Sequence, residues 1–209
     1  NEGFPPEALD HKLREFVHTL APGMEYISHS SSEGVSGGGP YRALPMKEYF
    51  EKQSGKIHSE RGMPNVMNIE SMQRTFSPEA LWPQSLQWGQ HDFTLQGAQR
   101  AASFNKMVEE GFGQAKSAEE FCRWAQLVNY NGYRAMFEST SKSRAGLLLW
   151  MSHPCWPSMV WQTYDYYFDP TAAYFGCKKA CEPLHIQYNS LTDSIEIVNH
   201  SAGNRQAVT

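Results

Sequence analysis

The first forty residues show one clear helical pattern followed by weaker signals. After Pro5-Pro6, apolar residues recur at helical spacing over residues 7–20, and an Ala-Pro-Gly sequence then ends the pattern. The shared apolar face consists of Leu9, Leu13, Phe16, Val17 and Leu20. Residues 24–28 predict a short strand, whereas residues 30–40 are rich in serine and glycine, and this composition excludes regular structure.

A second short strand is predicted shortly afterwards. Residues 41–53 leave helix and strand open, with a helical turn expected over residues 47–51. The sequence Lys-Ile-His-Ser-Glu at residues 56–60 predicts a strand, which ends in a polar turn at Arg61-Gly62. Glu60 is therefore expected at the end of a strand.

The middle of the chain is predicted to be largely helical, from Ser77 to about residue 143. Ser77 followed by proline is typical of an N-cap with proline at the first helical position. A capping box at residues 117–120 opens the last helix of this region. The apolar face of that helix consists of Phe121, Trp124, Ala125, Val128, Ala135 and Met136. Residues 146–151, Gly-Leu-Leu-Leu-Trp-Met, then predict a buried strand.

The pattern changes near Pro183. A helix is predicted over residues 169–181, whereas residues 184–188 and 194–198 alternate without an intervening helix, as in an antiparallel sheet. Before this point strands and helices alternate, which indicates an α/β fold with a parallel sheet. Roughly four strands do not close a barrel of eight, so half a barrel without its first part is the natural interpretation. A domain boundary is placed near Pro183.

Charge and hydropathy exclude several classes of function. The 209 residues carry a formal net charge of -4, and no run of Lys or Arg suggests binding to nucleic acid or to a membrane surface. No apolar run approaches the roughly 20 residues that span a bilayer, and the first residues show no signal peptide. Aromatic residues make up 13% of the chain, and their flat apolar rings suit the C–H faces of sugars as well as an ordinary core.

Two glutamates occupy positions where strands are expected to end. Glu2 precedes Gly3 and a helix, and Glu60 ends the second predicted strand. In a parallel barrel the carboxyl ends of all strands lie on one face, where catalytic groups collect. Two carboxylates there can divide glycosidic cleavage, one protonating the leaving oxygen and the other attacking the anomeric carbon. Each acidic residue of the chain is also compatible with an ordinary solvated position.

Four stretches of the sequence resemble the second half of the catalytic barrel of glycoside hydrolase family 2. Asn1-Glu2 is similar to the end of its fourth strand, and residues 57–62, Ile-His-Ser-Glu-Arg-Gly, to its seventh. Residues 148–166 are similar to the eighth strand and its long loop, and residues 174–188 to the last helix and the exit into a β-sandwich. The last stretch most resembles the branch with β-mannosidases, plant-type endo-β-mannosidases and exo-β-glucosaminidases. The similarity is weakest over residues 76–115.

This resemblance implies a fold and a mechanism. Residues 1–183 would form the C-terminal half of a (β/α)8 TIM barrel, and residues 184–209 the first strands of an immunoglobulin-like β-sandwich. Glu2 would be the acid/base and Glu60 the nucleophile of a retaining β-glycosidase, and Asn1 would hydrogen-bond the sugar 2-hydroxyl. No metal or organic cofactor is implied.

Departures from the family pattern bear on the substrate. The chitosan-acting members have Asp after Ser where this chain has Asn1-Glu2, which argues against chitosan and favours a terminal β-mannoside or β-galactoside. The barrel strands that supply much of the pocket for the nonreducing sugar are absent from the sequence. The two carboxyls of a retaining pair lie about 5–5.5 Å apart, so they do not readily ionise at the same time. Glu60 is expected as the anion, aided by Arg61 or Tyr26, and Glu2 as the protonated acid.

Aromatic and histidine side chains are candidate sugar contacts, each with an ordinary structural alternative. Trp150, at the end of the strand predicted over residues 146–151, could form the floor of the sugar site or belong to the core, and the resemblance favours the floor. The same choice between sugar contact and loop or core packing stays open for His29, His58, His153, Trp156 and Trp161.

Three further groupings point to other chemistry. Cys177, Cys181 and His185 have ligand-like spacing, but structural zinc usually needs a fourth ligand, so plain packing is favoured. Cys155 with a histidine could form a nucleophile pair, although no known signature surrounds it. The three glycines of residues 37–39 lack the ending of a phosphate loop and are expected to form a flexible lid.

The expected partners are a carbohydrate substrate and the remainder of a parent polypeptide. A half barrel leaves sheet edges and apolar faces open, so self-association of the isolated chain is also expected. The rival interpretation is a non-catalytic half-barrel module with a structural role or weak carbohydrate binding. The four cysteines form no CxxC pair and leave the redox compartment open. A periplasmic or secreted location is favoured over a cytoplasmic one.

Overall fold

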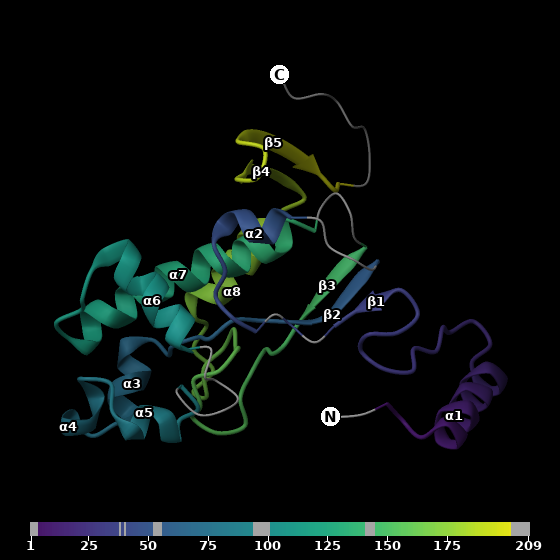
Figure 1. Cartoon of the computed structure of the whole chain (residues 1–209), viewed down its shortest axis with the longest axis horizontal. Coiled ribbons are helices and arrows are strands. Elements are labelled where there is room, and N and C mark those ends of the chain that lie inside the picture. The colour runs from purple at the N-terminus through teal and green to yellow at the C-terminus, as the bar shows by residue number, and fades with distance from the viewer. Residues whose placement is uncertain are drawn as a thin grey trace.

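The structure of the chain is a computed structural model that describes residues 4–37, 39, 41–51, 56–93, 101–140 and 145–201 (Figure 1). The helices are α1 (Glu7–Leu20), α2 (Met46–Phe50), α3 (Ile69–Thr75), α4 (Pro78–Leu81), α5 (Leu86–Gln90), α6 (Ala101–Phe112), α7 (Ala118–Glu138) and α8 (Ala172–Ala180). The strands are β1 (Val35–Ser36), β2 (Ile57–Arg61), β3 (Gly146–Leu149), β4 (Leu184–Asn189) and β5 (Ser194–Asn199). In the part of the chain described, no helix has the length and apolar character needed to cross a membrane.

The first sheet is parallel, with the strand order β1-β2-β3. Val35 pairs with Ile57, which pairs in turn with Gly146. Helices lie between consecutive strands in the chain, so the predicted α/β fold with a parallel sheet is confirmed. β1 falls within residues 30–40, and the expectation of no regular structure there is wrong. Pairing with β2 supplies hydrogen bonds that composition does not reveal.

Residues 24–28 do not form the predicted strand. Ser28 and Tyr26 donate hydrogen bonds to Asp10 Oδ1 of α1 at 2.6 and 2.8 Å. These two bonds, Ser28 first, lower the pKa of the Asp10 carboxyl. The segment is thus attached to α1 through its side chains, and no described strand lies beside it to form a ladder.

Helix α7 passes through the helical body and is its longest described helix (Figure 1). It begins at the predicted cap, where Ser117 Oγ accepts a hydrogen bond from Glu120 N at 3.2 Å. α8 packs along α7, and a Cβ at Gly176 would collide with the carbonyl oxygen of Tyr130, so glycine allows the two helices to approach. The core around α7 includes Tyr49, Met63, Met67, Trp88, Phe104 and Tyr133.

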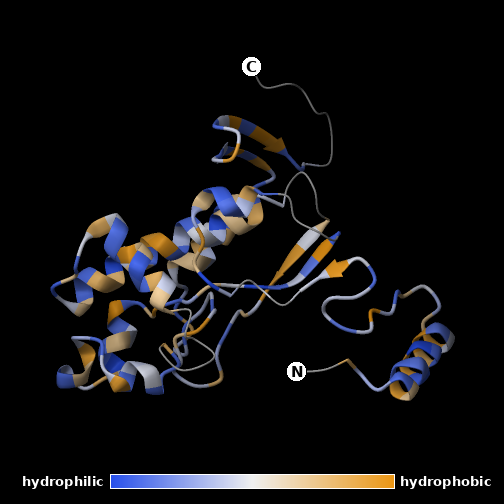
Figure 2. Cartoon of the chain, in the orientation of Figure 1, coloured by the Kyte–Doolittle hydropathy of each residue, from blue (hydrophilic) through white to orange (hydrophobic). Residues whose placement is uncertain are grey.

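Some apolar surfaces of the described chain face solvent. α1 is helical as predicted but has no buried residue, and Phe16 and Leu20 on its apolar face are 62% and 78% exposed. Figure 1 shows α1 well away from the helical body, and Figure 2 shows hydrophobic residues on α1, β3 and the C-terminal strands. In β3 Leu147 is buried but Leu148 is 59% exposed, so the prediction of a buried strand holds for Leu147 and is wrong for Leu148. Among the described strands only β2 lies beside β3.

The C-terminal strands β4 and β5 form the predicted antiparallel pair, with Ile186 opposite Ile197 and Tyr188 opposite Ile195. Burial alternates along β4 in an unusual sense, since its polar residues are buried and its apolar residues are exposed. The buried set is His185, Gln187 and Asn189, and the exposed set is Leu184, Ile186 and Tyr188. This β4–β5 hairpin therefore packs its polar side inward. The domain boundary near Pro183 stays a prediction.

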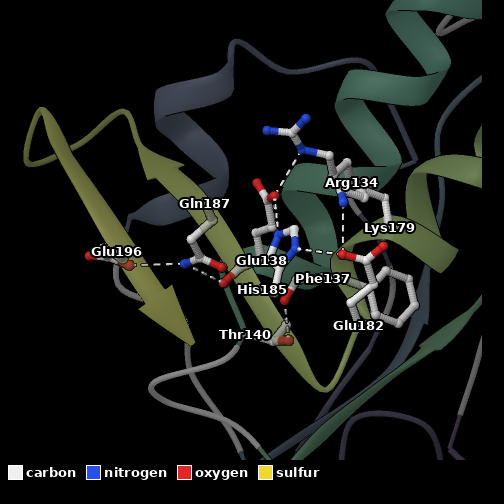
Figure 3. Close-up of polar contacts among 9 residues, drawn as sticks. All are labelled: Arg134, Phe137, Glu138, Thr140, Lys179, Glu182, His185, Gln187 and Glu196. Carbon is white, nitrogen blue, oxygen red and sulfur yellow. Dashed lines mark hydrogen bonds and ion pairs between the residues drawn. The ribbon is translucent and has the colours of Figure 1, made fainter. Parts of the chain in front are cut away.

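A buried ionic cluster fastens the β4–β5 hairpin to the end of α7 (Figure 3). The Glu138 side chain is fully buried, and its Oε1 accepts hydrogen bonds from Arg134 Nε at 2.8 Å and from His185 Nε2 at 2.7 Å. His185 Nδ1 lies 3.8 Å from Glu182 Oε2, and Gln187 donates to the Glu138 carbonyl at 3.3 Å. A buried carboxylate is tolerated only with such partners.

The Glu138 cluster gives a prediction about stability. Glu138→Gln is expected to lower the free energy of unfolding by about 3 kcal/mol, because it removes the charge that Arg134 and His185 share inside the protein. Urea unfolding followed by circular dichroism measures the change. The matched control is Glu110→Gln, whose i,i+4 pair with Lys106 at 3.6 Å is exposed and contributes little. If both variants unfold like the native chain, the cluster does not hold the hairpin.

The exposed apolar faces support the expected self-association of the isolated chain. At micromolar concentration, size-exclusion chromatography with light scattering should give a mass above that of one chain, because burying apolar area drives association. Phe16→Glu with Leu20→Glu should lower that mass by placing charge on the α1 face. A monomeric native chain would contradict the expectation.

Candidate active site

Glu60 lies one residue before the end of β2, at the carboxyl edge of the parallel sheet. Its side chain is half-buried, and Oε2 accepts a hydrogen bond from the Tyr41 hydroxyl at 2.5 Å. A hydroxyl–carboxylate bond of this length is typical of a charge-assisted bond. The carboxylate of Glu60 is therefore held in one orientation at the sheet edge where catalytic groups of parallel folds collect.

Tyr41 is itself positioned by Trp161 of the long loop after β3. Trp161 Nε1 donates to the carbonyl oxygen of Tyr41 at 3.3 Å, and the two rings lie 4.9 Å apart. Trp161 has a φ of 34°, which is uncommon for a bulky residue, and its own carbonyl accepts a bond from Met151 N at 2.6 Å. The loop after β3 therefore helps to hold the donor on Glu60.

His58 connects β2 to the chain that precedes Tyr41. Its Nδ1 accepts a hydrogen bond from Glu60 N at 3.3 Å, so the ring proton belongs on Nε2, which lies 2.7 Å from the Gly39 carbonyl. Gly39 N also donates to Glu60 O at 3.3 Å. These bonds attach Gly39 to β2. The expected flexible lid over residues 37–39 stays a prediction, and residue 38 lies outside the described residues. The buried His58 thus positions backbone, and its contact with sugar stays a prediction.

Trp150 follows β3 directly beside the end of β2. Its backbone N–H donates to the Arg61 carbonyl at 2.9 Å. A Cβ at Gly62 would collide with the carbonyl oxygen of Trp150, so the close approach of the two segments requires glycine. The Trp150 side chain is 40% exposed at the same sheet edge as Glu60. It is accessible to a ligand, although sugar contact itself stays a prediction.

Trp156 and His153 lie in the long loop and pack on aromatic neighbours. The Trp156 ring, also partly exposed, stacks on His91 with centroids 5.9 Å apart. The His153 ring stacks on Phe168 at 4.3 Å. Both arrangements agree with loop packing and leave a role in sugar binding as a prediction.

His29 lies in the loop between α1 and β1. Its Nδ1 accepts a hydrogen bond from Ser31 N at 3.3 Å. The adjacent Ser30 carbonyl accepts a bond from Ser59 Oγ at 2.7 Å, which attaches this loop to β2 next to Glu60. The structure therefore brings the His29 loop to the strand that carries Glu60, while a sugar contact by His29 stays a prediction.

One hydrogen-bond donor on Glu60 was not predicted from sequence. The prediction for Tyr26 is wrong, because its hydroxyl donates to a carboxylate of α1. The guanidinium of Arg61 is buried and lies 5.1 Å from the ring centre of Tyr49. Tyr41 is the described donor, and help from Arg61 stays a prediction. The sequence signal that could have identified Tyr41 is a tyrosine hydroxyl that follows the glycine-rich residues 37–39.

Glu2 and Asn1 lie outside the described residues, so the separation of the two expected catalytic carboxyls is not defined by the structure. The described side of the site consists of Glu60, its donor Tyr41 and the exposed Trp150. Such an arrangement can present an oriented carboxylate next to an aromatic surface.

The four cysteines are free thiols, of which Cys155 is exposed, and the other three lie in surroundings that disfavour ionisation. Burial raises the pKa of Cys122 to about 12 and also raises the pKa values of Cys177 and Cys181. The third candidate zinc ligand, His185, instead bonds to Glu138. Within the described ranges, no three or more His, Cys, Asp and Glu side chains are grouped so as to hold a metal ion.

Sequence comparison identifies relatives among characterised glycosidases, although no family profile matches the chain. It is 30% identical over 187 residues to an exo-β-D-glucosaminidase of Streptomyces avermitilis. It is 29% identical over 197 residues to a mannosylglycoprotein endo-β-mannosidase of Lilium longiflorum. These alignments cover 82% and 83% of this chain but 20% and 21% of the relatives. The chain therefore spans about a fifth of the length of the curated relatives it matches.

The fold is also similar to that of a solved glycosidase. The crystal structure of the exo-chitosanase of Amycolatopsis orientalis matches with a TM-score of 0.79 at 25% identity, over 94% of this chain and 26% of that chain. Sequence and structure thus confirm the predicted resemblance. The chain is a homologue of exo-β-D-glucosaminidases and β-mannosidases and fits a member of glycoside hydrolase family 2.

Proposed function

We propose that this chain forms part of the catalytic domain of a retaining β-glycosidase and belongs to a longer polypeptide. The observation that carries the proposal is the orientation of Glu60 at the carboxyl edge of the sheet, fixed by Tyr41 and beside the exposed Trp150. The relatives, which are named as an exo-β-D-glucosaminidase and an endo-β-mannosidase, support the class of reaction.

In the proposed reaction, Glu60 attacks the anomeric carbon and forms a glycosyl ester while the bond to the leaving oxygen breaks. Glu2 gives its proton to that oxygen and then removes a proton from the water that attacks the anomeric carbon. Glu60 departs as a carboxylate, a charge that the hydrogen bond from Tyr41 stabilises. Trp150 would form the floor under the sugar, and Asn1 would bond the 2-hydroxyl.

The proposed substrate is a terminal β-linked hexose, with a β-mannoside or β-galactoside first. The pair Asn1-Glu2 supports this choice, while the similarity to exo-β-D-glucosaminidases makes a β-glucosaminide the necessary comparison. Values of kcat/KM on the three nitrophenyl glycosides separate these substrates, because the ratio measures differential binding of the transition state.

We also propose that residues 1–183 belong to a barrel and residues 184–209 begin a β-sandwich. The exposed apolar side of the β4–β5 hairpin supports this division, because the sheets of a sandwich cover each other's apolar faces. The buried polar side of the hairpin would be the junction with the barrel.

The rival function is a non-catalytic half-barrel module with a structural or weak sugar-binding role. The exposed apolar faces of α1 and the hairpin favour an incomplete catalytic unit over an independent module. The two functions differ in one outcome, which is whether turnover in the longer polypeptide depends on Glu60.

Replacement of Glu60 tests the nucleophile directly. In the longer polypeptide, Glu60→Ala should reduce kcat by roughly a thousandfold or more, because the attacking oxygen is lost. Added azide should restore cleavage and yield a glycosyl azide with inverted anomeric configuration. The matched control is Glu48→Ala, which removes an exposed glutamate of α2. Undiminished turnover of the Glu60 variant would remove the nucleophile assignment.

Replacement of Tyr41 tests the hydrogen bond on Glu60. Tyr41→Phe should lower kcat by roughly tenfold to a hundredfold with a smaller change in KM, because a charge-stabilising donor is lost while the ring remains. Tyr26→Phe is the matched control, since its hydroxyl bonds to α1. Steady-state kinetics on the preferred nitrophenyl glycoside measure both variants. A larger effect at Tyr26 than at Tyr41 would reverse the assignment of the donor.

A further inference from the structure

A cavity of about 260 Å³ lies between the chain after α4, helix α6 and the beginning of α7. Its volume is somewhat below the range of about 300–1,000 Å³ typical of pockets for drug-sized ligands, so it suits a small ring. The residues that determine its chemistry are Trp82, Gln84, Asn105, Glu109, Gln114 and Phe121. None of them belongs to the candidate active site around Glu60.

One wall of the cavity is aromatic and held in place by the core. The ring of Trp82 is half-buried and lies 5.7 Å from the ring of the buried Phe121. Trp88, which is fully buried, meets the edge of Trp82 at 6.2 Å. A ring restrained in this way presents an apolar surface with little conformational freedom to lose when a ligand binds.

The cavity is also lined by polar side chains that bond to one another, the pair Gln84 and Asn105 being part-buried and the pair Glu109 and Gln114 exposed. Gln84 and Asn105 exchange hydrogen bonds, with Nε2 to Oδ1 at 3.3 Å and Nδ2 to Oε1 at 2.7 Å. Because each amide nitrogen has two hydrogens, this pairing leaves one N–H on each side chain for a ligand. Gln114 Nε2 donates to Glu109 Oε1 at 2.9 Å, which orients the carboxylate of Glu109.

The charge of the lining selects the class of ligand. Among the described residues that line the cavity there is Glu109 and no Lys, Arg or His, so phosphate, sulfate and carboxylate ligands are disfavoured. Amide N–H groups and a carboxylate can instead bond hydroxyl groups, and the carboxylate can also bond an ammonium group. A cavity lined by a restrained aromatic ring and by such polar groups matches a pyranose, whose C–H face is apolar and whose edge is polar.

We propose that this cavity binds one sugar unit of an oligosaccharide at a site separate from Glu60. The class of ligand rests on the proposed glycosidase function, while the site rests on its own residues. Trp82 packs against the apolar face of the ring, and the pair Gln84–Asn105 together with Glu109 bonds its hydroxyl or amino substituents.

The test is calorimetric titration of the 209-residue chain carrying Glu60→Gln with β-1,4-mannobiose and with the β-1,4 disaccharide of glucosamine. We expect at least one disaccharide to bind. Gln84→Ala and Glu109→Gln should each weaken that binding by about five- to tenfold, the effect of losing one or two polar contacts. Trp82→Ala should weaken it further. The Gln84 and Glu109 variants keep the test valid if the Trp82 variant fails to fold.

Two controls separate this site from the active site. Glu110→Gln, an exposed neighbour of Glu109 on α6, should leave the affinity unchanged. Trp150→Ala removes the proposed floor of the active site and should not change the binding that Gln84→Ala and Glu109→Gln weaken. If Trp150→Ala instead abolishes that same binding, the binding belongs to the active site and the proposal is overturned. No binding of either sugar, or binding indifferent to Gln84, Glu109 and Trp82, would overturn it too. Failure of Glu60 as nucleophile would not alter these titrations.

Discussion

The parallel register of β2 between β1 and β3 determines where the described groups of the candidate site lie. Because β1 runs in the same direction as β2, the chain that leaves β1 passes the end of β2, where Gly39 bonds to the backbone of Glu60. Tyr41 then reaches the Glu60 carboxylate. On the other side, the bond from Trp150 to the Arg61 carbonyl places an exposed indole at the same edge. A shift of the register by one residue would turn Glu60 to the opposite face of the sheet and separate it from Tyr41.

Elements whose signal is local are the ones that sequence predicts well. α1 and α7 have helical apolar spacing, α7 also has a cap, and the β4–β5 hairpin alternates over both strands. β1 is two residues long and forms because β2 lies beside it, whereas residues 24–28 have no described neighbouring strand. Local sequence does not predict the role of Tyr41 for the same reason, because its hydrogen bond to Glu60 depends on where a glycine-rich segment passes β2. The place of Glu60 near the end of a strand is predicted correctly from a local pattern, while its role as nucleophile rests on the resemblance and stays a proposal.

Whether an apolar face is buried depends on neighbouring layers of the fold, which a local sequence pattern does not predict. The apolar face of α1, Leu148 of β3 and the outer face of the β4–β5 hairpin would each normally pack against another layer, yet each faces solvent here. Such surfaces are expected of a chain that spans about a fifth of its relatives' length. The inner face of the hairpin is polar instead of apolar. Its His185 is buried and bonded to Glu138 at the end of α7. Hydrogen bonds therefore determine how the hairpin joins the helical body, while the apolar residues of the hairpin lie on its outer face.

The placement of Glu2, the proposed acid/base, would depend on one of these uncovered faces. Asp10 of α1 bonds to Ser28, and Ser30 of the same loop bonds to Ser59, the residue before Glu60. A few polar contacts of this kind keep α1 near β2, but they do not set a carboxyl separation to about 5–5.5 Å, as a retaining pair requires. Covering the apolar face of α1 would add about 25 cal/mol for each Å² buried, a much stronger restraint on the helix that follows Glu2 in the chain. The layer that would complete the core would therefore also hold the proposed pair of Glu2 and Glu60 at the distance that a retaining mechanism needs, so folding and activity of this site are expected to be coupled.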